Sequence, residues 1–143
     1  MAGFFFSYSV SVMLGLKKMS SLDFIVTMKN INREIQNFLF LLCFFGSLSG
    51  LFVSSFVFRN SEVSVYVFSG LFCYFIGAFL VTVIFNVPLN SRLETFDINA
   101  ATNMTVEEMR ADFEKKWNFW NNVRTFSSFL ALLCLILACI KLK

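Results

Sequence analysis

The sequence predicts an all-α, membrane-embedded four-helix bundle that forms a single domain over residues 1–143. Of the 143 residues, 57% are hydrophobic and 15% are charged, whereas soluble domains have about 25% charged residues. The chain contains 21 phenylalanines, more than one soluble core of this size can bury. Four apolar runs have no charged residue, at 1–16, 38–58, 63–85 and 125–140.

Each run is assigned to a spanning helix, because about 20 apolar residues cross roughly 30 Å of hydrocarbon. The second and third runs have this length, and the first and fourth are shorter. A signal peptide is an alternative for the first run, but no basic residue precedes it, and Lys17 and Lys18 follow it. The expected spans are about 2–18, 36–58, 63–86 and 117–140.

The second and fourth helices are predicted to start several turns before the membrane, on the same side of it. Ser20 or Ser21 is a candidate N-cap, and apolar residues recur at helical spacing from Leu22 into the second run. Thr105 and Glu108 have the spacing of a capping box. No proline interrupts either stretch, so each is expected to be one continuous helix.

Most basic residues lie on the side of these two extensions. The positive-inside rule makes that side cytoplasmic and both termini external, with the plasma membrane as the expected location. The net charge of +3 is too weak to indicate nucleic-acid binding. The absence of histidine excludes His-based metal sites and Ser-His or Cys-His nucleophiles. No metal-ligand motif or glycine-rich phosphate loop is visible, so no metal and no cofactor are expected.

The third helix is expected to stop or kink at Pro88, because proline lacks an amide hydrogen and disfavours helical geometry at Val87. Asn86 and Asn90 flank this point. They are interpreted either as caps for the freed carbonyl groups or as the hydrogen-bonding wall of a pocket. The residues alone leave both interpretations open.

Trp117, Trp120, Asn121 and Arg124 share an arc of roughly 100° at the start of the fourth span, bordered by Asn118. One interpretation is an interfacial belt with a snorkelling arginine. The other is a pocket, since an arginine at the head of a spanning helix usually faces a protein interior or a watery cavity. Its planar fork suits an oxyanion, a phenolate or a carboxylate.

The order of the predicted spans places their polar end residues near the same membrane face. Arg33 and Asn37 precede the second span, Asn86 and Asn90 end the third, and the Arg124 cluster begins the fourth. The sequence therefore predicts a polar ligand pocket at one mouth of the bundle. Tyr8 in the first span is a further candidate, because hydroxyl groups within a membrane seek partners.

Small residues and cysteines are assigned structural roles. Gly46 with Gly50, and Gly70 with Gly77, are predicted to allow close packing between helices of the bundle. The four cysteines are dispersed without a paired motif and are expected to be inert buried thiols.

Two motifs resemble the anthrone-oxygenase-like family of small integral membrane proteins. They are Asn86-Val87-Pro88-Leu89-Asn90 and Trp117-x-x-Trp120-Asn121-x-x-Arg124-Thr125. The resemblance implies a four-helix membrane protein, and characterised members oxidise polyketide anthrones to anthraquinones with dioxygen and no recognised metal or organic cofactor. It further implies that Arg124 and the asparagines stabilise an enolate oxygen while the tryptophans stack on a flat ring. Family members often have histidine, a candidate base, at the position of Asn122.

The resulting functional hypothesis is a multi-pass membrane protein that binds a small lipophilic molecule or a partner in this pocket. The alternative is a cofactor-independent oxygenase acting on a polycyclic anthrone or phenol. The candidate catalytic residues are Arg124, Asn121, Asn86 and Asn90, and the candidate ligand-binding residues are Trp117, Trp120, Asn118, Asn37, Arg33 and Tyr8. Expected partners are the lipid bilayer and an apolar aromatic ligand, with a homo-oligomer left open. A transporter or channel would require a pore formed by such an oligomer.

Overall fold

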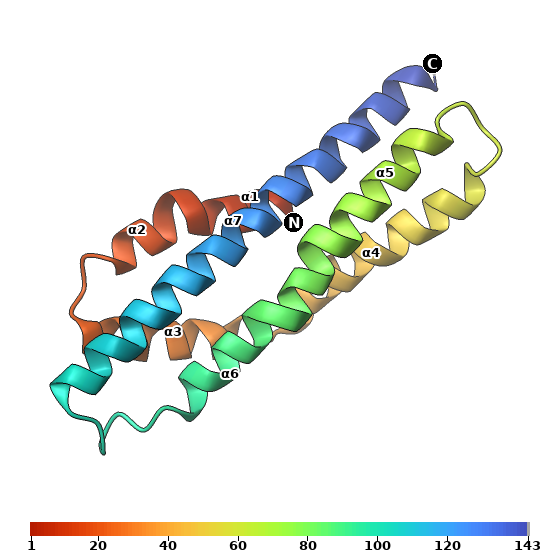
Figure 1. Cartoon of the computed structure of the whole chain (residues 1–143). Coiled ribbons are helices and arrows are strands. Elements are labelled where there is room, and N and C mark those ends of the chain that lie inside the picture. The colour runs from red at the N-terminus through yellow and green to blue at the C-terminus, as the bar shows by residue number, and fades with distance from the viewer. Residues whose placement is uncertain (143) are drawn as a thin grey trace.

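The computed structural model describes residues 1–142, which form five helical rods and contain no strand (Figure 1). The predicted all-α class is therefore confirmed, with five rods where the sequence predicted four helices. Two rods contain π-helical segments, labelled η. The rods are, in chain order, α1 (Ala2–Ser7) with η1 (Tyr8–Val12) and α2 (Met13–Leu16); α3 (Ser21–Glu34); α4 (Phe38–Val57); α5 (Ser64–Tyr74) with η2 (Phe75–Leu80), η3 (Thr82–Asn86) and α6 (Val87–Thr95); and α7 (Asn103–Lys141).

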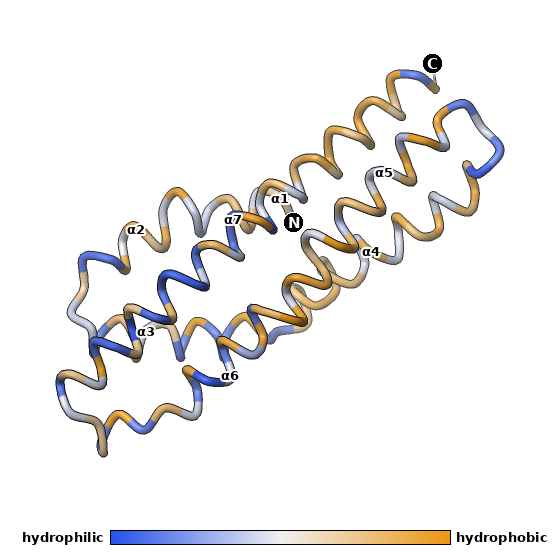
Figure 2. The backbone as a smooth tube through the Cα atoms, in the orientation of Figure 1, coloured by the Kyte–Doolittle hydropathy of each residue, from blue (hydrophilic) through white to orange (hydrophobic). Residues whose placement is uncertain are grey.

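Three rods are long and apolar enough to cross a membrane, namely α4, Ser64–Thr95 and α7, with 20, 32 and 39 residues. The rod Ala2–Leu16 is apolar but shorter. Hydrophobic residues dominate α4, α5 and the C-terminal half of α7, while hydrophilic residues gather at α3, α6 and the start of α7 (Figure 2). The chain is therefore a membrane protein with most of its charge at one end of the long helices.

The continuous second helix predicted from Ser20 or Ser21 is wrong, because the chain breaks between α3 and α4. Asn37 has an extended backbone, and its Oδ1 accepts a hydrogen bond from the backbone N–H of Phe40 at 3.0 Å. Its Nδ2 donates to the carbonyl oxygen of Glu34 at 2.8 Å. One amide thus caps the end of α3 and the start of α4, which stabilises a break without proline or glycine.

The third helix does not end at Pro88 but continues to Thr95. Just before Pro88, the amide of Val87 donates to the carbonyl oxygen of Thr82, five residues earlier, in the wider π-helical pattern of η3. Pro88 then lies in the first turn of α6, where its missing N–H leaves no donor unpaired. Asn86 and Asn90 therefore lie within a continuous rod and not at its C-terminus.

The fourth predicted helix is confirmed as the continuous α7, but its cap differs. Thr102 accepts from the amide of Thr105 at 3.3 Å, so the cap precedes the Thr105–Glu108 pair assigned from spacing. At the start of α3, Ser20 is the N-cap and accepts from the amide of Asp23 at 3.2 Å.

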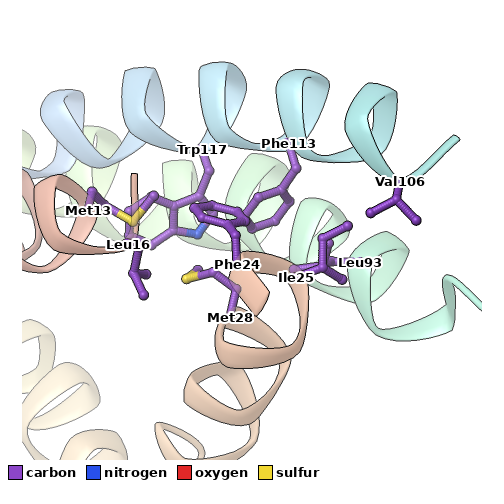
Figure 3. Packing of buried hydrophobic residues seen from close by; sticks show 9 residues of the cluster. All are labelled: Met13, Leu16, Phe24, Ile25, Met28, Leu93, Val106, Phe113 and Trp117. Atoms are coloured by element: carbon purple, nitrogen blue, oxygen red, sulfur yellow. The ribbon is translucent and has the colours of Figure 1, made fainter. Parts of the chain in front are cut away.

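A hydrophobic core at the charged end fixes α3 against α6 and α7 (Figure 3). Trp117 and Phe113 of α7 point towards Phe24 of α3, and the Phe24 and Phe113 ring centroids lie 6.3 Å apart. Phe24 is fully buried, as is Met28 beside it. This packing positions Trp117, which also lines a cavity between the helices.

The predicted glycine contacts are correct for one pair and wrong for the other. Gly70 and Gly77 face α7, against Ala131 and Ser127 respectively. Gly46 and Gly50 have open space around them and make no contact of this kind within residues 1–142. The cysteines are free and are half-buried or exposed, so their predicted burial is wrong.

Candidate functional site

A cavity of about 660 Å³ lies between the first rod, α3, α4, the Ser64–Thr95 rod and α7. Its inner part combines aromatic rings with a few polar groups. The aromatic members are Phe4, Phe5, Tyr8, Phe40, Phe44 and Trp117. The inner polar members are Asn32, Thr82, Asn86, Asn90, Asn121 and Arg124. A pocket of this size and composition is typical of a small-molecule site.

Arg124 is the cation of the inner cavity, and only 6% of its surface is exposed. Its guanidinium donates to Asn121 Oδ1 at 2.9 Å and to Thr82 Oγ1 at 3.3 Å. Its Cζ lies 4.6 Å from the ring centroid of Phe5 and 5.4 Å from that of Trp117. Among residues 1–142 it has no carboxylate partner, and its Nε has no hydrogen-bond partner. The cation is thus held by neutral groups and remains available to an anionic or electron-rich oxygen.

Asn86 places a buried, unpaired side-chain amide in the cavity. It is 1% exposed, and within the described residues neither its Oδ1 nor its Nδ2 has a hydrogen-bond partner. The Nδ2 of Asn32, also buried and lining the cavity, is unpaired in the same sense. An unsatisfied buried polar group costs about 1–3 kcal/mol, so a ligand or water that paired with these amides would stabilise the site by a similar amount.

The orientation of Asn121 is fixed by the first rod. Its Nδ2 donates to the carbonyl oxygen of Phe5 at 3.1 Å and to Ser9 Oγ at 2.9 Å. Both donors are therefore occupied, and Oδ1 faces Arg124. Ser9 in turn donates to Asn122 Oδ1 at 2.8 Å, so an ordered chain of hydrogen bonds leads from Asn122 to Arg124. Asn122 itself is exposed and does not line the cavity.

Trp117 closes one side of the cavity. Its indole Nε1 donates to Asn90 Oδ1 at 3.1 Å, and its ring lies 5.5 Å from that of Tyr8. Asn90 is thereby used partly to position the indole. Trp117 and Tyr8 present flat, polarizable surfaces beside the Arg124 cation.

The lining residues that lie at the molecular surface fall into two groups. One is a polar rim on α3, α6 and the turn after α3, formed by Arg33, Gln36, Ser91, Glu94 and Thr95. Arg33 Nε donates to Glu94 Oε1 at 2.9 Å, which joins α3 to α6 across this rim. The other is an apolar gap between α4 and the η3–α6 segment, formed by Leu41, Phe45, Val83 and Val87.

Seven of the sequence-predicted site residues line the cavity, and three lie elsewhere. The seven are Arg124, Asn121, Asn86, Asn90, Trp117, Arg33 and Tyr8. Trp120 stacks on Phe85 with ring centroids 3.6 Å apart, and Asn37 caps α4. Asn118 is half-buried and is not a lining residue.

Sequence reasoning missed Asn32, Thr82 and the phenylalanines of the first rod and α4. Thr82 precedes Asn86 by four residues, and this spacing is a usable signal for a shared helix face. No sequence signal separated Phe5 or Phe44 from the other phenylalanines. Within residues 1–142, no group of three cysteine or acidic side chains could hold a metal ion.

Comparison with known proteins identifies a family for this chain. Residues 28–134 match the family model described as anthrone oxygenase. This segment contains most of the cavity residues, including Asn86, Trp117 and Arg124. Neither a curated protein nor a solved structure matches the chain.

Proposed function

Because the chain belongs to the anthrone oxygenase family, we propose that its cavity binds a flat lipophilic aromatic ketone or phenol and oxidises it with dioxygen. One observation carries the proposal. Asn86 and Arg124 leave buried polar atoms unpaired inside a cavity otherwise lined largely by aromatic and aliphatic side chains. In a ligand with an oxygen substituent on an apolar ring system, the oxygen would pair with the polar atoms and the rings would pack on the apolar side chains.

The volume supports a polycyclic ligand, since small-molecule pockets commonly measure about 300–1,000 Å³ and this one measures about 660 Å³. In the proposed pose the ligand oxygen accepts from Arg124 and from Asn86 Nδ2. Asn86 Oδ1 then accepts from a neighbouring hydroxyl group of the ligand. The ring body packs between Phe4, Phe44 and Trp117.

Arg124 supplies the chemistry by stabilising negative charge on the ligand oxygen. Loss of a proton from the ring CH₂ of an anthrone gives an enolate, whose charge is shared between that carbon and the oxygen. A fixed cation and amide donor aimed at this oxygen favour the anion, as oxyanion holes do. The departing proton passes to water at the polar rim.

In the remaining steps the substrate itself supplies all the electrons that reduce dioxygen. The enolate transfers one electron to dioxygen, and the resulting radicals combine to form a carbon–oxygen bond. Protonation gives a hydroperoxide, which loses its remaining ring-carbon proton and hydroxide as water and forms the second carbonyl. One anthrone and one dioxygen thus yield one anthraquinone and one water.

Binding without turnover is the second candidate. It is favoured because neither Glu94 nor Asn122 is a ready base for the ligand proton. Glu94, the carboxylate of the polar rim, is engaged with Arg33, and Asn122 lacks a titratable group and lies outside the cavity. In this case the same ligand class would occupy the same cavity, and dioxygen consumption would not depend on the protein.

The test is dioxygen uptake by the detergent-purified, metal-stripped protein, offered a panel of anthrones and related phenols. Arg124→Gln removes the buried cation, and Arg59→Gln removes an exposed one outside the cavity as the matched control. We expect Arg124→Gln to lower quinone formation by about 10²–10³-fold, the usual effect of losing an oxyanion donor, with Arg59→Gln unchanged. Equal rates in all samples, at the spontaneous level, would leave binding as the function.

A further inference from the structure

We infer that ligands enter this cavity sideways from the lipid bilayer, through the apolar gap between α4 and the η3–α6 segment. The inference rests on the proposed function only in that it takes the cavity as a ligand site. It does not require any reaction to occur there.

The residues of the apolar gap line the cavity and are also exposed on the outside. Leu41 and Phe45 of α4 are 41% and 50% exposed, and Val83 of η3 and Val87 of α6 are 47% and 50% exposed. A side chain that both lines a cavity and lies on the molecular surface borders an opening. All four are apolar, so this opening presents a contiguous hydrophobic border of the kind that suits contact with hydrocarbon.

The helix packing explains why the opening lies there. α4 packs closely on α5 and more weakly on η2. Within the part of the chain that the structure describes, no comparable packing joins α4 to η3 or α6. The two rods run from the turn that joins them (Figure 1) and are in contact as far as the rings of Phe45 and Phe79, whose centroids lie 5.8 Å apart. Beyond this contact, α4 is not packed closely against η3 or α6 in residues 1–142.

The depth of the gap suits an amphipathic aromatic molecule. Phe45 lies two helical turns, or about 10 Å, after the start of α4. Val87 lies at the end of the long uncharged run of the Ser64–Thr95 rod. The gap thus spans the outer hydrocarbon and the headgroup boundary, the region where aromatic rings with a polar end accumulate.

Polar contacts cross the aqueous side of the cavity. Arg33 pairs with Glu94 across the polar rim, and Lys29 Nζ donates to the carbonyl oxygen of Phe96 at 2.7 Å. Both contacts fasten α3 to the end of the Ser64–Thr95 rod. The polar rim is thus crossed by charged and hydrogen-bonded groups, whereas the apolar gap is bridged by no hydrogen bond in residues 1–142.

Trp117 provides a direct readout, because it lines the cavity, is 5% exposed and is one of only two tryptophans. In a Trp120→Phe background its fluorescence reports on molecules that reach the cavity. We would reconstitute this protein in nanodiscs of phosphatidylcholine brominated near the start of the acyl chain, since bromine quenches indole on contact. Acrylamide, a water-soluble quencher, probes the polar rim in parallel.

The expected result is loss of Trp117 emission in the brominated bilayer, with little quenching by acrylamide. Leu41→Phe with Val83→Phe fills the apolar gap and should restore the emission. Val53→Phe, which enlarges an exposed α4 residue outside the cavity, should leave the quenching unchanged. Quenching by acrylamide alone, or lipid quenching that persists when the gap is filled, would overturn the inference.

This test is independent of turnover. A protein that oxidises nothing would still show quenching through the apolar gap. An active oxygenase whose cavity is reached from water would show quenching by acrylamide only. The proposed function and the entry route can therefore fail separately.

Discussion

The guanidinium carbon of Arg124 lies 4.6 Å from the ring centroid of Phe5, so the buried cation meets a π-electron surface where a carboxylate would be expected. A carboxylate partner would neutralise Arg124 and compete with an incoming oxyanion. The Phe5 ring and the neutral oxygens of Asn121 and Thr82 hold the cation without cancelling its charge. The Arg124 charge is therefore available to an anionic ligand oxygen.

Asn86→Leu is expected to stabilise the protein while abolishing ligand binding. Both amide atoms of Asn86 are buried and unpaired, and leucine has the same branched shape without their desolvation cost. We expect a gain of about 1–3 kcal/mol in unfolding free energy, measured by chemical unfolding in detergent. Ligand binding followed by Trp117 fluorescence should be lost. A destabilised Asn86→Leu protein would show that the amide is satisfied by the fold itself.

Gly77→Ala is expected to destabilise the contact between η2 and α7. A Cβ at this position would overlap the Cβ and Oγ of Ser127. Overpacking of this kind costs about 1–3 kcal/mol, whereas Gly46→Ala adds a Cβ to open space and serves as the control. Ser127→Gly should rescue Gly77→Ala in a double-mutant cycle of unfolding midpoints. Additive effects of the two changes would contradict direct contact.

Asp112 is expected to contribute a small, acid-sensitive stabilisation at the charged end. The hydrogen bond from Lys116, reinforced by that from Arg92, lowers the pKa of its carboxyl group in spite of partial desolvation. Because the folded-state pKa lies below the unfolded one, the stabilisation is present at neutral pH and is lost as the pH falls through the folded-state value.

For this exposed cluster the contribution should stay below about 1 kcal/mol. Asp112→Asn should lower the thermal midpoint slightly at pH 7 and have no effect in strong acid. Its neighbour Glu108, which forms no ion pair within residues 1–142, is the matched control as Glu108→Gln. A larger effect of Asp112→Asn in acid than at pH 7 would reverse the assigned sign.

Helical periodicity was sufficient to predict most of α7 and the shared face of Trp117, Asn121 and Arg124. It could not distinguish Trp117 from Trp120, because both lie on one broad arc. Their separation depends on the neighbours that each meets: Trp117 reaches Asn90 and Trp120 stacks on Phe85. Such a choice is set by tertiary packing, which one helix pattern does not contain.

Two of the helix boundaries that differ from those predicted have local causes. Asn37 breaks the second predicted helix by capping in both directions, although asparagine also occurs within helices. Pro88 is tolerated because the preceding π-helical turn moves the carbonyl that it would otherwise meet. Both effects depend on backbone geometry that residue identity alone leaves undetermined.

The central claim is that Arg124 stabilises the anion of a bound aromatic ketone. The most direct measurement is an anaerobic absorbance titration of anthrone bound to the protein, which follows the long-wavelength band of its anion. The apparent pKa of bound anthrone should fall below that of anthrone in the same detergent, and Arg124→Gln should return it to the free value while Arg59→Gln does not. An unchanged pKa in the wild-type protein would contradict the account.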